Sequence, residues 1–355
     1  MKAKLILMAT GLLSTAMFWN CQNKGITNAT PSQNTTGPVL PEKPYDYPNG
    51  DDNKATLGRV LFYDKNLSIN NGVSCGSCHK QENAFCDNMQ FSTGTHQRLT
   101  DRNTPSIFSK VGRMFWDGRA GNSSDLALGP IKNPVEMDFS DLPALCSRLS
   151  SLDYYPVLFK NAFGTAKIDS LRIREALAAF VNNFTFSDTK FNKSKSGRAV
   201  LTTQENQGKD LFFGQALCSQ CHHIDDNGST GTGYGVADTD ANIGLDAAYK
   251  DQGRGKLTGN SSDNGKFMVP VLLNVEHTAP YMHDGRFKTL EEVVEHYNSK
   301  IQNHPNLDFR LRDFNGQPKK LNLTDADKAA LVAFLKTLSD NKIFTDQRFS
   351  DPFVN

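Results

Sequence analysis

The chain has 355 residues, of which 38% are hydrophobic and 22% are charged, and its formal net charge is +1 at pH 7. This length accommodates two domains, each with a core of its own. The near-neutral charge gives no indication of nucleic-acid binding or of a strongly acidic partner. Composition alone therefore leaves a globular protein of ordinary type, and the motifs must indicate its function.

The N-terminus has the features of an export signal. Lys2 and Lys4 precede an apolar run over residues 5–18, which is shorter than the roughly 20 residues that span a bilayer. Cys21 closes the segment and indicates lipoprotein processing, with acylation of that cysteine, although the residues before it match the usual small-residue pattern poorly. An ordinary secreted protein and a retained anchor are the alternatives. We therefore predict a signal peptide over residues 1–21.

Residues 22–48 are rich in Asn, Thr, Pro and Gly, which is typical of a flexible tether. A lipid at Cys21 would be the only membrane attachment that the sequence indicates.

The motif C-x-x-C-H occurs twice, at residues 75–79 and 218–222, and it is the attachment pattern of c-type haem. Two thiols about one helical turn apart can form thioethers to one porphyrin edge, and the histidine then lies under the iron as its axial ligand. No further cysteine lies nearby to complete a zinc site. We predict two covalently bound haems c, held by Cys75, Cys78, Cys218 and Cys221, with His79 and His222 as proximal iron ligands.

Covalent haem attachment agrees with export, so we expect the protein in the periplasm. In that oxidising compartment Cys86 and Cys146 can form a disulfide, and two buried free thiols are the alternative.

The chain contains an internal repeat, and the haem motif is one part of each copy. The first copy comprises residues 58–62, 75–79, 103–105 and 116–119, and the second comprises residues 208–212, 218–222, 268–270 and 283–286. The order is the same in both copies and the spacings are similar. We therefore predict an N-terminal haem domain over residues 49–195, a C-terminal haem domain over residues 196–340 and a tail over residues 341–355.

Local patterning favours a mainly α fold with two cytochrome c-like helical domains. Apolar residues recur at helical spacing over residues 168–184 and 324–338. Thr202 with Glu205, and Thr289 with Glu292, have the spacing of capping boxes that open helices. Few segments alternate strictly enough to be strands, and we expect the Gly-rich residues 227–235 to be a loop.

The two copies differ after their shared D-G-R sequence, where the first leads to Glu136 and the second to Tyr297. A carboxylate over an open iron can transfer protons during peroxide cleavage, whereas a phenolate can ligate ferric iron and close its sixth position. Each residue also has a simpler interpretation: Glu136 as a helix cap or surface ion pair, Tyr297 as a core residue at helical spacing, and Trp116 as a core aromatic.

Together these residues resemble the bacterial di-haem cytochrome c peroxidases and their MauG-like relatives. The resemblance extends over about residues 50–340. It is carried by the ordered runs Leu57-Gly-Arg-Val-Leu-Phe, Ser74-Cys-Gly-Ser-Cys-His, Arg102-Asn-Thr-Pro-Ser, Phe115-Trp-Asp-Gly-Arg-Ala, Gly129-Pro-Ile-Lys-Asn-Pro-Val-Glu-Met and Thr278-Ala-Pro-Tyr-Met-His-Asp-Gly-Arg.

The resemblance implies roles for particular residues. Glu136 would be the distal acid–base residue at the peroxidatic N-terminal haem, and Trp116 would lie between the haems and assist electron transfer. Asn103, with the backbone carbonyls of Thr278 and Pro280, would hold one calcium ion, for which hard oxygen ligands are suited.

Three positions depart from the pattern of many family members. The histidine that blocks the N-terminal iron in many peroxidases is replaced by Thr95, with His96 one residue away, so we expect an open N-terminal haem. Many peroxidases have a methionine ligand of the C-terminal haem at the position of Tyr297. A tyrosine at this position resembles MauG. Met268 and Met282 are the alternative ligands of this haem. Leu126 replaces a glutamine of the distal pocket, which changes the polar surroundings of Glu136.

The sequence therefore predicts a peroxidase that reduces hydrogen peroxide with electrons from an external donor such as a small cytochrome c. The alternatives are a MauG-type oxidase acting on a protein or organic substrate, and a non-catalytic electron-transfer cytochrome. The family includes dimers, so a homodimer is an expectation from the resemblance, although nothing in this sequence indicates one.

Overall fold

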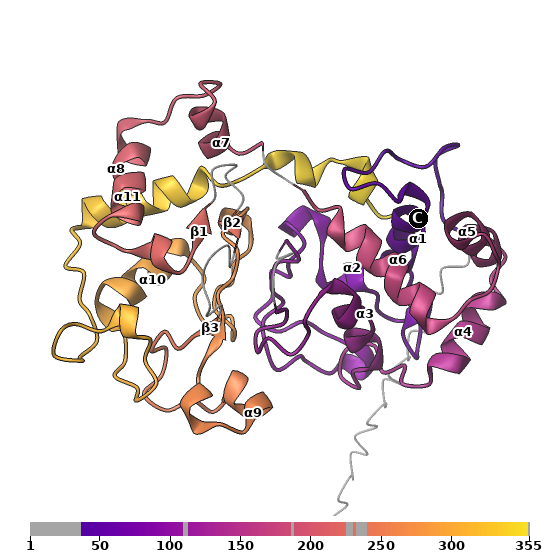
Figure 1. Ribbon diagram of the computed structural model, residues 1–355, viewed down its shortest axis with the longest axis horizontal. Coiled ribbons are helices and arrows are strands. Elements are labelled where there is room, and N and C mark those ends of the chain that lie inside the picture. Colours follow the sequence, from indigo (N-terminus) through magenta and orange to yellow (C-terminus); the bar gives the residue numbers. More distant parts are fainter. Residues whose placement is uncertain (1–36, 109–112, 186–187, 225–229, 232–239, 354–355) are drawn as a thin grey trace, which may run out of the picture. The chain divides into compact units, whose positions relative to one another are not determined.

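The computed structural model describes residues 37–108, 113–185, 188–224, 230–231 and 240–353 (Figure 1). These residues are mainly helical, as the sequence predicts. The helices of the N-terminal half are α1 (Asp52–Tyr63), α2 (Cys75–Cys78), α3 (Ser123–Lys132), α4 (Leu142–Ser150), α5 (Tyr154–Phe163), α6 (Ser170–Asn182) and α7 (Lys190–Lys195). Those of the C-terminal half are α8 (Thr203–Phe213), α9 (Arg254–Thr258), α10 (Leu290–Glu295) and α11 (Asp325–Lys336).

The strands of the described residues are short and form two antiparallel pairs. β1 (His223–Ile224) pairs with β2 (Thr230–Gly231), and β3 (Asp240–Ala241) pairs with β4 (Phe267–Met268). The predicted Gly-rich loop at residues 227–235 lies outside the described residues except for β2. The predicted signal peptide, Cys21 and the first part of the predicted tether also lie outside them.

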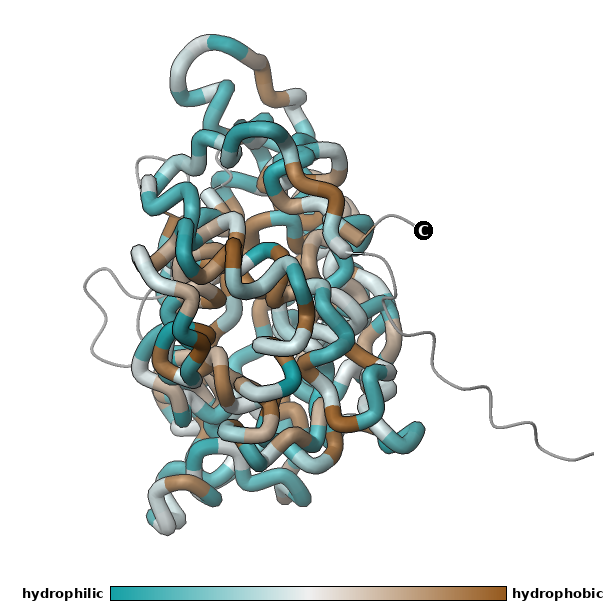
Figure 2. Tube along the Cα trace, turned by 90° about the vertical axis from the view of Figure 1, so that its right-hand side faces the viewer, coloured by the Kyte–Doolittle hydropathy of each residue, from teal (hydrophilic) through white to brown (hydrophobic). Residues whose placement is uncertain are grey.

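The predicted helices are present. The helical pattern over residues 168–184 corresponds to α6, and that over residues 324–338 corresponds to α11. Both predicted capping boxes are formed, by Thr202 at the start of α8 and by Thr289 at the start of α10. Along the trace as a whole, Figure 2 shows hydrophobic residues interspersed with hydrophilic ones. In α6, Ile173, Ala176, Leu177 and Phe180 are buried, so this helix has an apolar face against the core.

Each half contains an equivalent crossing of two helices, and this crossing explains why a glycine recurs at Gly58 and Gly208. α1 packs against α6, and α8 packs against α11. At the crossings, a Cβ atom on Gly58 would collide with the carbonyl oxygen of Ala176, and a Cβ atom on Gly208 with that of Ala330. The two repeats therefore bring their helices together at a point where only glycine fits.

The main apolar core lies in the N-terminal half and includes the end of the chain. Phe62, Phe85, Phe180 and Phe184 form its centre, and the Phe349 ring packs in a tilted orientation against the last two of these rings. The chain end thus returns to α1, beside which Figure 1 places it.

Hydrogen bonds hold this returning segment in place. The hydroxyl of Tyr63 donates to the carbonyl of Phe349 at 2.6 Å, and Arg59 Nε donates to that of Ser350 at 2.6 Å. Tyr47, near the end of the predicted tether, is buried and donates to the carbonyl of Arg348 at 3.0 Å. The segment predicted as a tail therefore forms part of the N-terminal core.

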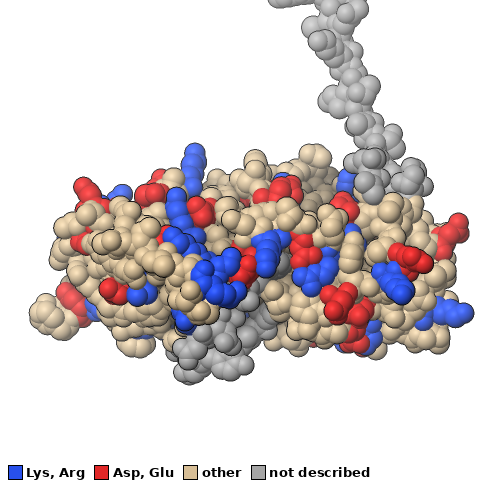
Figure 3. Space-filling model, turned by 90° about the horizontal axis from the view of Figure 1, so that it is seen from above, with Lys and Arg blue, Asp and Glu red and all other residues tan. Residues whose placement is uncertain are grey.

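The face seen in Figure 3 carries Lys and Arg interspersed with Asp and Glu, and the basic side chains gather toward its middle. Asp188 is one of the carboxylates that bind several cations, with Lys193 at 3.1 Å and Lys342 at 3.0 Å. Over the part of the chain that the structure describes, every helix is too short or too polar to cross a bilayer.

Candidate functional site

The first C-x-x-C-H motif forms a single helical turn that presents its histidine to a cavity. Ser74 caps α2 in a capping box with Ser77, which fixes the start of the turn. The ring nitrogen Nδ1 of His79 donates to the carbonyl oxygen of Phe85 at 2.8 Å. Because Nδ1 carries the proton, Nε2 has the free lone pair that an iron ligand needs. Burial lowers the pKa of His79, which favours the neutral ring.

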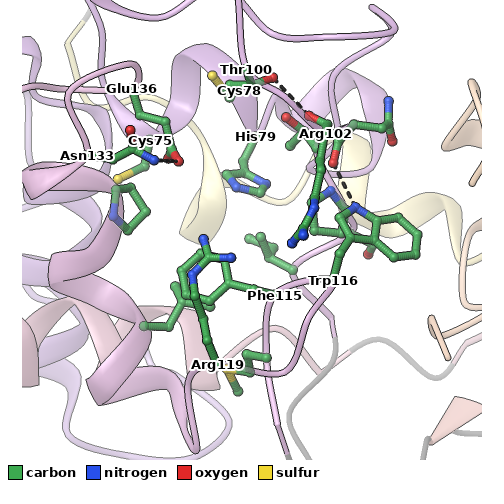
Figure 4. A pocket seen from close by; sticks show the side chains of 18 of the residues that line it. Cys75, Cys78, His79, Thr100, Arg102, Phe115, Trp116, Arg119, Asn133 and Glu136 are labelled. Carbon is green, nitrogen blue, oxygen red and sulfur yellow. Dashed lines mark hydrogen bonds between the residues drawn. The ribbon is translucent and has the colours of Figure 1, made fainter. Parts of the chain in front are cut away.

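A cavity of about 600 Å³ opens beside this motif (Figure 4), within the size range of cofactor sites. Cys75, Cys78 and His79 line it from α2 and its end. Its apolar lining comes from Phe62, Val73, Leu126, Ala127, Met137, Leu177 and Val181. Two thiols, a neutral imidazole and an apolar wall are the groups that covalent haem requires, so the residues present fit that cofactor.

Glu136 lies in the same cavity with two polar neighbours. Asn133 Nδ2 donates to Glu136 Oε1 at 2.6 Å, which leaves Oε2 for another partner. Burial raises the pKa of Glu136, and the positive charge of Arg119 and the hydrogen bond from Asn133 oppose that rise. A buried carboxyl group of this kind can take up and release a proton at Oε2.

Arg119 is held over the cavity by a stacking contact and an ion pair. Its guanidinium lies 3.6 Å from the centroid of the Phe115 ring, and it binds Asp117 at 2.9 Å. Leu126, which is expected in the distal pocket, also lines the cavity. The charged neighbour of Glu136 is Arg119, whose signal in the sequence is only its place in the repeated D-G-R.

The second motif holds its histidine through a distant segment. Cys218 begins a short 3-10 turn, and Nδ1 of His222 donates to the carbonyl oxygen of Pro270 at 3.0 Å. Burial lowers the pKa of His222 to about 4, so its ring is neutral at pH 7 and can ligate a metal through Nε2. Cys218, Cys221 and His222 thus present the same donor set as the first motif.

Tyr297 lies close to this second motif. It belongs to a π-helical turn, His296–Lys300, that continues α10, and π turns often occur at functional sites. Burial raises the pKa of Tyr297, and the nearby thiols of Cys221 and Cys218 add to the rise. The structure therefore brings Tyr297 together with the second haem motif. Met268, one of the alternative ligands, instead lines the first cavity.

Comparison with known proteins agrees with this pair of sites. The model of the di-haem cytochrome c peroxidase family matches residues 52–199, and that of the cytochrome c family matches residues 206–339. Cytochrome c551 peroxidase of Nitrosomonas europaea is 33% identical over 313 residues, covering 86% of this chain and 85% of that protein. The chain belongs to the di-haem cytochrome c peroxidase family.

Two further relatives show the breadth of this di-haem peroxidase family. The methylamine utilization protein MauG of Methylorubrum extorquens is 32% identical, covering 80% of this chain and 78% of that protein. The crystal structure of a MauG-like protein associated with microbial copper homeostasis is 33% identical, with a TM-score of 0.75, covering 92% of this chain and 99% of that one. Membership implies an oxidoreductase with two c-type haems, and similarity alone does not separate peroxidase from MauG.

In this member of the di-haem cytochrome c peroxidase family, Trp116 lies where the two halves exchange backbone hydrogen bonds. Its indole Nε1 donates to the carbonyl of Asn103 at 2.8 Å. The amide of Met268 donates to the carbonyl of Trp116, and the amide of Asn103 donates to that of His283, both at 2.8 Å. The two bonds are equivalent under the repeat, because Met268 corresponds to Asn103 and Trp116 to His283. Because Pro270 bonds His222, the segment from Met268 to Pro270 contacts both Trp116 and the second histidine.

Thr95 and His96 lie at the position where many members of this family have a histidine that blocks the first iron. His96 forms an ion-pair contact with Asp138 at 3.3 Å, and its side chain is 48% exposed. Thr95 is buried, and its amide donates to the carbonyl of Glu136 at 2.9 Å. Neither side chain is among those that line the first cavity. The open site beside His79 stays a prediction.

The residues considered for calcium offer neutral oxygens only. Asn103 is buried, and its Nδ2 donates to the carbonyls of Met89 at 3.1 Å and Gln90 at 3.3 Å, so its Oδ1 is the atom that can face a cation. Pro280 follows Ala279 through a cis peptide bond, and Thr278 is the residue before this pair. No cluster of three metal-binding His, Cys, Asp or Glu side chains is present among the described residues. The calcium site stays a prediction.

Haem content tests the attachment sites directly. Replacing both Cys218 and Cys221 by Ala is expected to halve the haem bound per chain, because only the first motif can then form thioethers. Pyridine haemochrome absorbance against protein mass measures this ratio. Cys146→Ala is the control, since this half-buried cysteine of α4 lies in neither motif. Two haems in the double variant would contradict the assignment.

Proposed function

We propose that this protein reduces hydrogen peroxide to water, with electrons from an external donor such as a small cytochrome c. The observation that carries the proposal is Glu136, a half-buried carboxyl group in the same cavity as His79, Cys75 and Cys78. A non-catalytic electron-transfer cytochrome has no need for an acid–base group in an open cavity.

The proposed reaction is H2O2 + 2 H⁺ + 2 e⁻ → 2 H2O. Haem held by Cys75, Cys78 and His79 would supply the iron that binds peroxide and passes electrons to it. Oε2 of Glu136 accepts a proton from the bound peroxide and returns it to the departing oxygen, while Asn133 holds Oε1 in place. Arg119 contributes positive charge beside Glu136 and favours its ionised form.

The second site would store and relay an electron. We propose that His222 and Tyr297 hold its iron from both sides, since Tyr297 lies near both thioether cysteines. Trp116 lies between the first cavity and the segment that bonds His222, which suits a role in electron transfer. We further propose export to the periplasm with a lipid at Cys21, on the basis of the N-terminal signal features. By analogy with the family, we propose one Ca²⁺ at Asn103, Thr278 and Pro280.

The second candidate is MauG-type oxidation of a protein or organic substrate, which the phenol of Tyr297 favours. Both candidates predict a reaction of the fully oxidised protein with one equivalent of peroxide, because the first site is open. Catalytic peroxide consumption with reduced cytochrome c would support the peroxidase. Stoichiometric reaction without such turnover would favour the MauG-type oxidase.

The Tyr297 assignment has a spectroscopic test. Tyr297→Phe is expected to abolish the optical and EPR signature of a phenolate-ligated ferric haem, because a phenyl ring offers no ligand atom. Tyr281→Phe is the matched control, since that half-buried hydroxyl donates to the carbonyl of Val275 at 2.9 Å. If the Tyr297→Phe spectra equal those of the unaltered protein, another residue ligates the second haem. If the oxidised protein does not react with peroxide until one electron is added, the sixth coordination position of the first iron is not free.

A further inference from the structure

A short hairpin after the first haem motif brings a buried carboxylate beside His79. The chain turns over residues 81–85 and pairs Lys80 with Cys86 in an antiparallel bridge. In such a bridge the residues on either side also face each other, which places Asp87 opposite His79. The same turn supplies the Phe85 carbonyl that accepts from His79 Nδ1. One hairpin therefore provides both the acceptor for the ring and a charge next to it.

Asp87 is held in place by a polar network that the proposed function does not use. Its Oδ1 binds Lys80 Nζ at 3.0 Å, and its Oδ2 accepts from the hydroxyl of Ser92 at 2.7 Å. Ser92 in turn shares a 2.7 Å hydrogen bond with the hydroxyl of Thr104, which lines the cavity. Asp87, Ser92 and Thr104 are all buried. Such a satisfied network fixes the position of the carboxylate.

The ion pair with Lys80 does not cancel the charge of Asp87 at His79. The side chain of Asp87 is 5% exposed and that of Lys80 is 31% exposed, so water screens the ammonium more than the carboxylate. The negative charge of Asp87 is therefore only partly compensated where it faces His79. The nearby carboxylate thus makes the ring a stronger electron donor to a metal.

The second site has a balanced ion pair beside its haem motif. Arg310 donates to the carbonyl of Gln220, inside that motif, at 3.2 Å, and pairs with Asp308 at 2.7 Å. Because the side chains of Arg310 and Asp308 are each 10% exposed, their opposite charges largely cancel at the second motif.

We propose that Asp87 is a positioning residue that stabilises the oxidised first haem through its charge beside His79. Reduction of ferric to ferrous iron adds one negative charge, which a buried carboxylate disfavours. This inference rests on the proposed ligation by His79.

Spectroelectrochemical titration of the protein with both haems bound tests it. Asp87→Asn is expected to raise the reduction potential of the first haem and leave that of the second unchanged. The expected change in the ratio of oxidised to reduced first haem is on the order of tenfold, which is about 59 mV for a one-electron couple. Lys80→Gln is expected to lower the same potential, because it removes the compensating charge.

The variants also guard against a merely structural effect. If Asp87→Asn and Lys80→Gln shift the first potential in the same direction, or if neither shifts it, the inference is wrong. If Asp87→Asn does not fold, the reduction potential of the first haem in Lys80→Gln still tests the inference. A lower potential supports the inference, and an unchanged or higher potential contradicts it. Spectra of the unaltered protein show independently whether histidine ligates the first haem, so an error in the proposed function is recognised separately.

Discussion

Replacing Glu136 by Gln is expected to lower the rate of peroxide turnover by about 10²- to 10⁴-fold, the range that a positioned acid–base group contributes. Glutamine has nearly the same shape and can keep the hydrogen bond with Asn133, but it cannot accept the peroxide proton at neutral pH. Haem content and the spectra of both haems should therefore remain unchanged. Steady-state peroxide consumption with a reduced cytochrome c as donor measures the loss.

The pH dependence gives this prediction a second readout. Because burial raises the pKa of Glu136, its carboxyl group stays protonated to a higher pH than an ordinary glutamic acid. As the pH falls through this raised pKa, Glu136 loses its ionised, proton-accepting form. On acidification, turnover should therefore begin to decline at a higher pH than it would with an ordinary glutamic acid. That acid limb should be missing in Glu136→Gln. Glu291→Gln, on the exposed side of α10, is the control and should behave as the unaltered protein. Equal turnover in the two variants would rule out the assigned role.

Replacing Gly208 by Ala is expected to destabilise the protein by about 2–4 kcal/mol, because the new Cβ atom would collide with the backbone carbonyl of Ala330. Helix propensity acts in the other direction, since alanine is favoured over glycine by about 1 kcal/mol inside a helix. The steric term is larger, because a backbone carbonyl in α11 cannot move without separating the two helices.

Thermal unfolding of the protein with both haems bound measures this effect, and the midpoint should fall by about 5–10 °C. Gly121→Ala is the matched control, since the nearest atom to its new Cβ would be Asp125 Oδ2 at 3.7 Å, an ordinary contact. A Gly208→Ala midpoint equal to that of the control would mean that the crossing of α8 and α11 can relax at little cost.

The sequence predicted well whatever depends on local pattern. The helix over residues 168–184 and the capping boxes at Thr202 and Thr289 are visible as spacings within one or two turns. The haem motifs are equally local, because two thioethers and one axial ligand require five consecutive residues. The ordered repeat of these motifs was enough to indicate the family and its two haem domains.

Contacts between distant residues could not be predicted in this way. No pattern in the sequence indicates that Pro270 accepts from His222, that Phe349 packs against Phe184, or that Arg119 lies beside Glu136. Each of these depends on how separate segments pack, and many alternative partners satisfy the same local rules. The role of Asp87 was missed for a related reason, since it follows from a bridge and a turn rather than from a motif.

The sequence by itself therefore determined that this protein has two haem-binding motifs, a mainly helical fold in two related halves, and different candidate residues after each D-G-R. Only the tertiary structure decided which residues surround each site: Glu136 with Asn133 and Arg119 at the first, and Tyr297 near the cysteines of the second. The physical reason is that covalent attachment is specified along the chain, whereas the field and the packing at each site come from residues that are far apart in it.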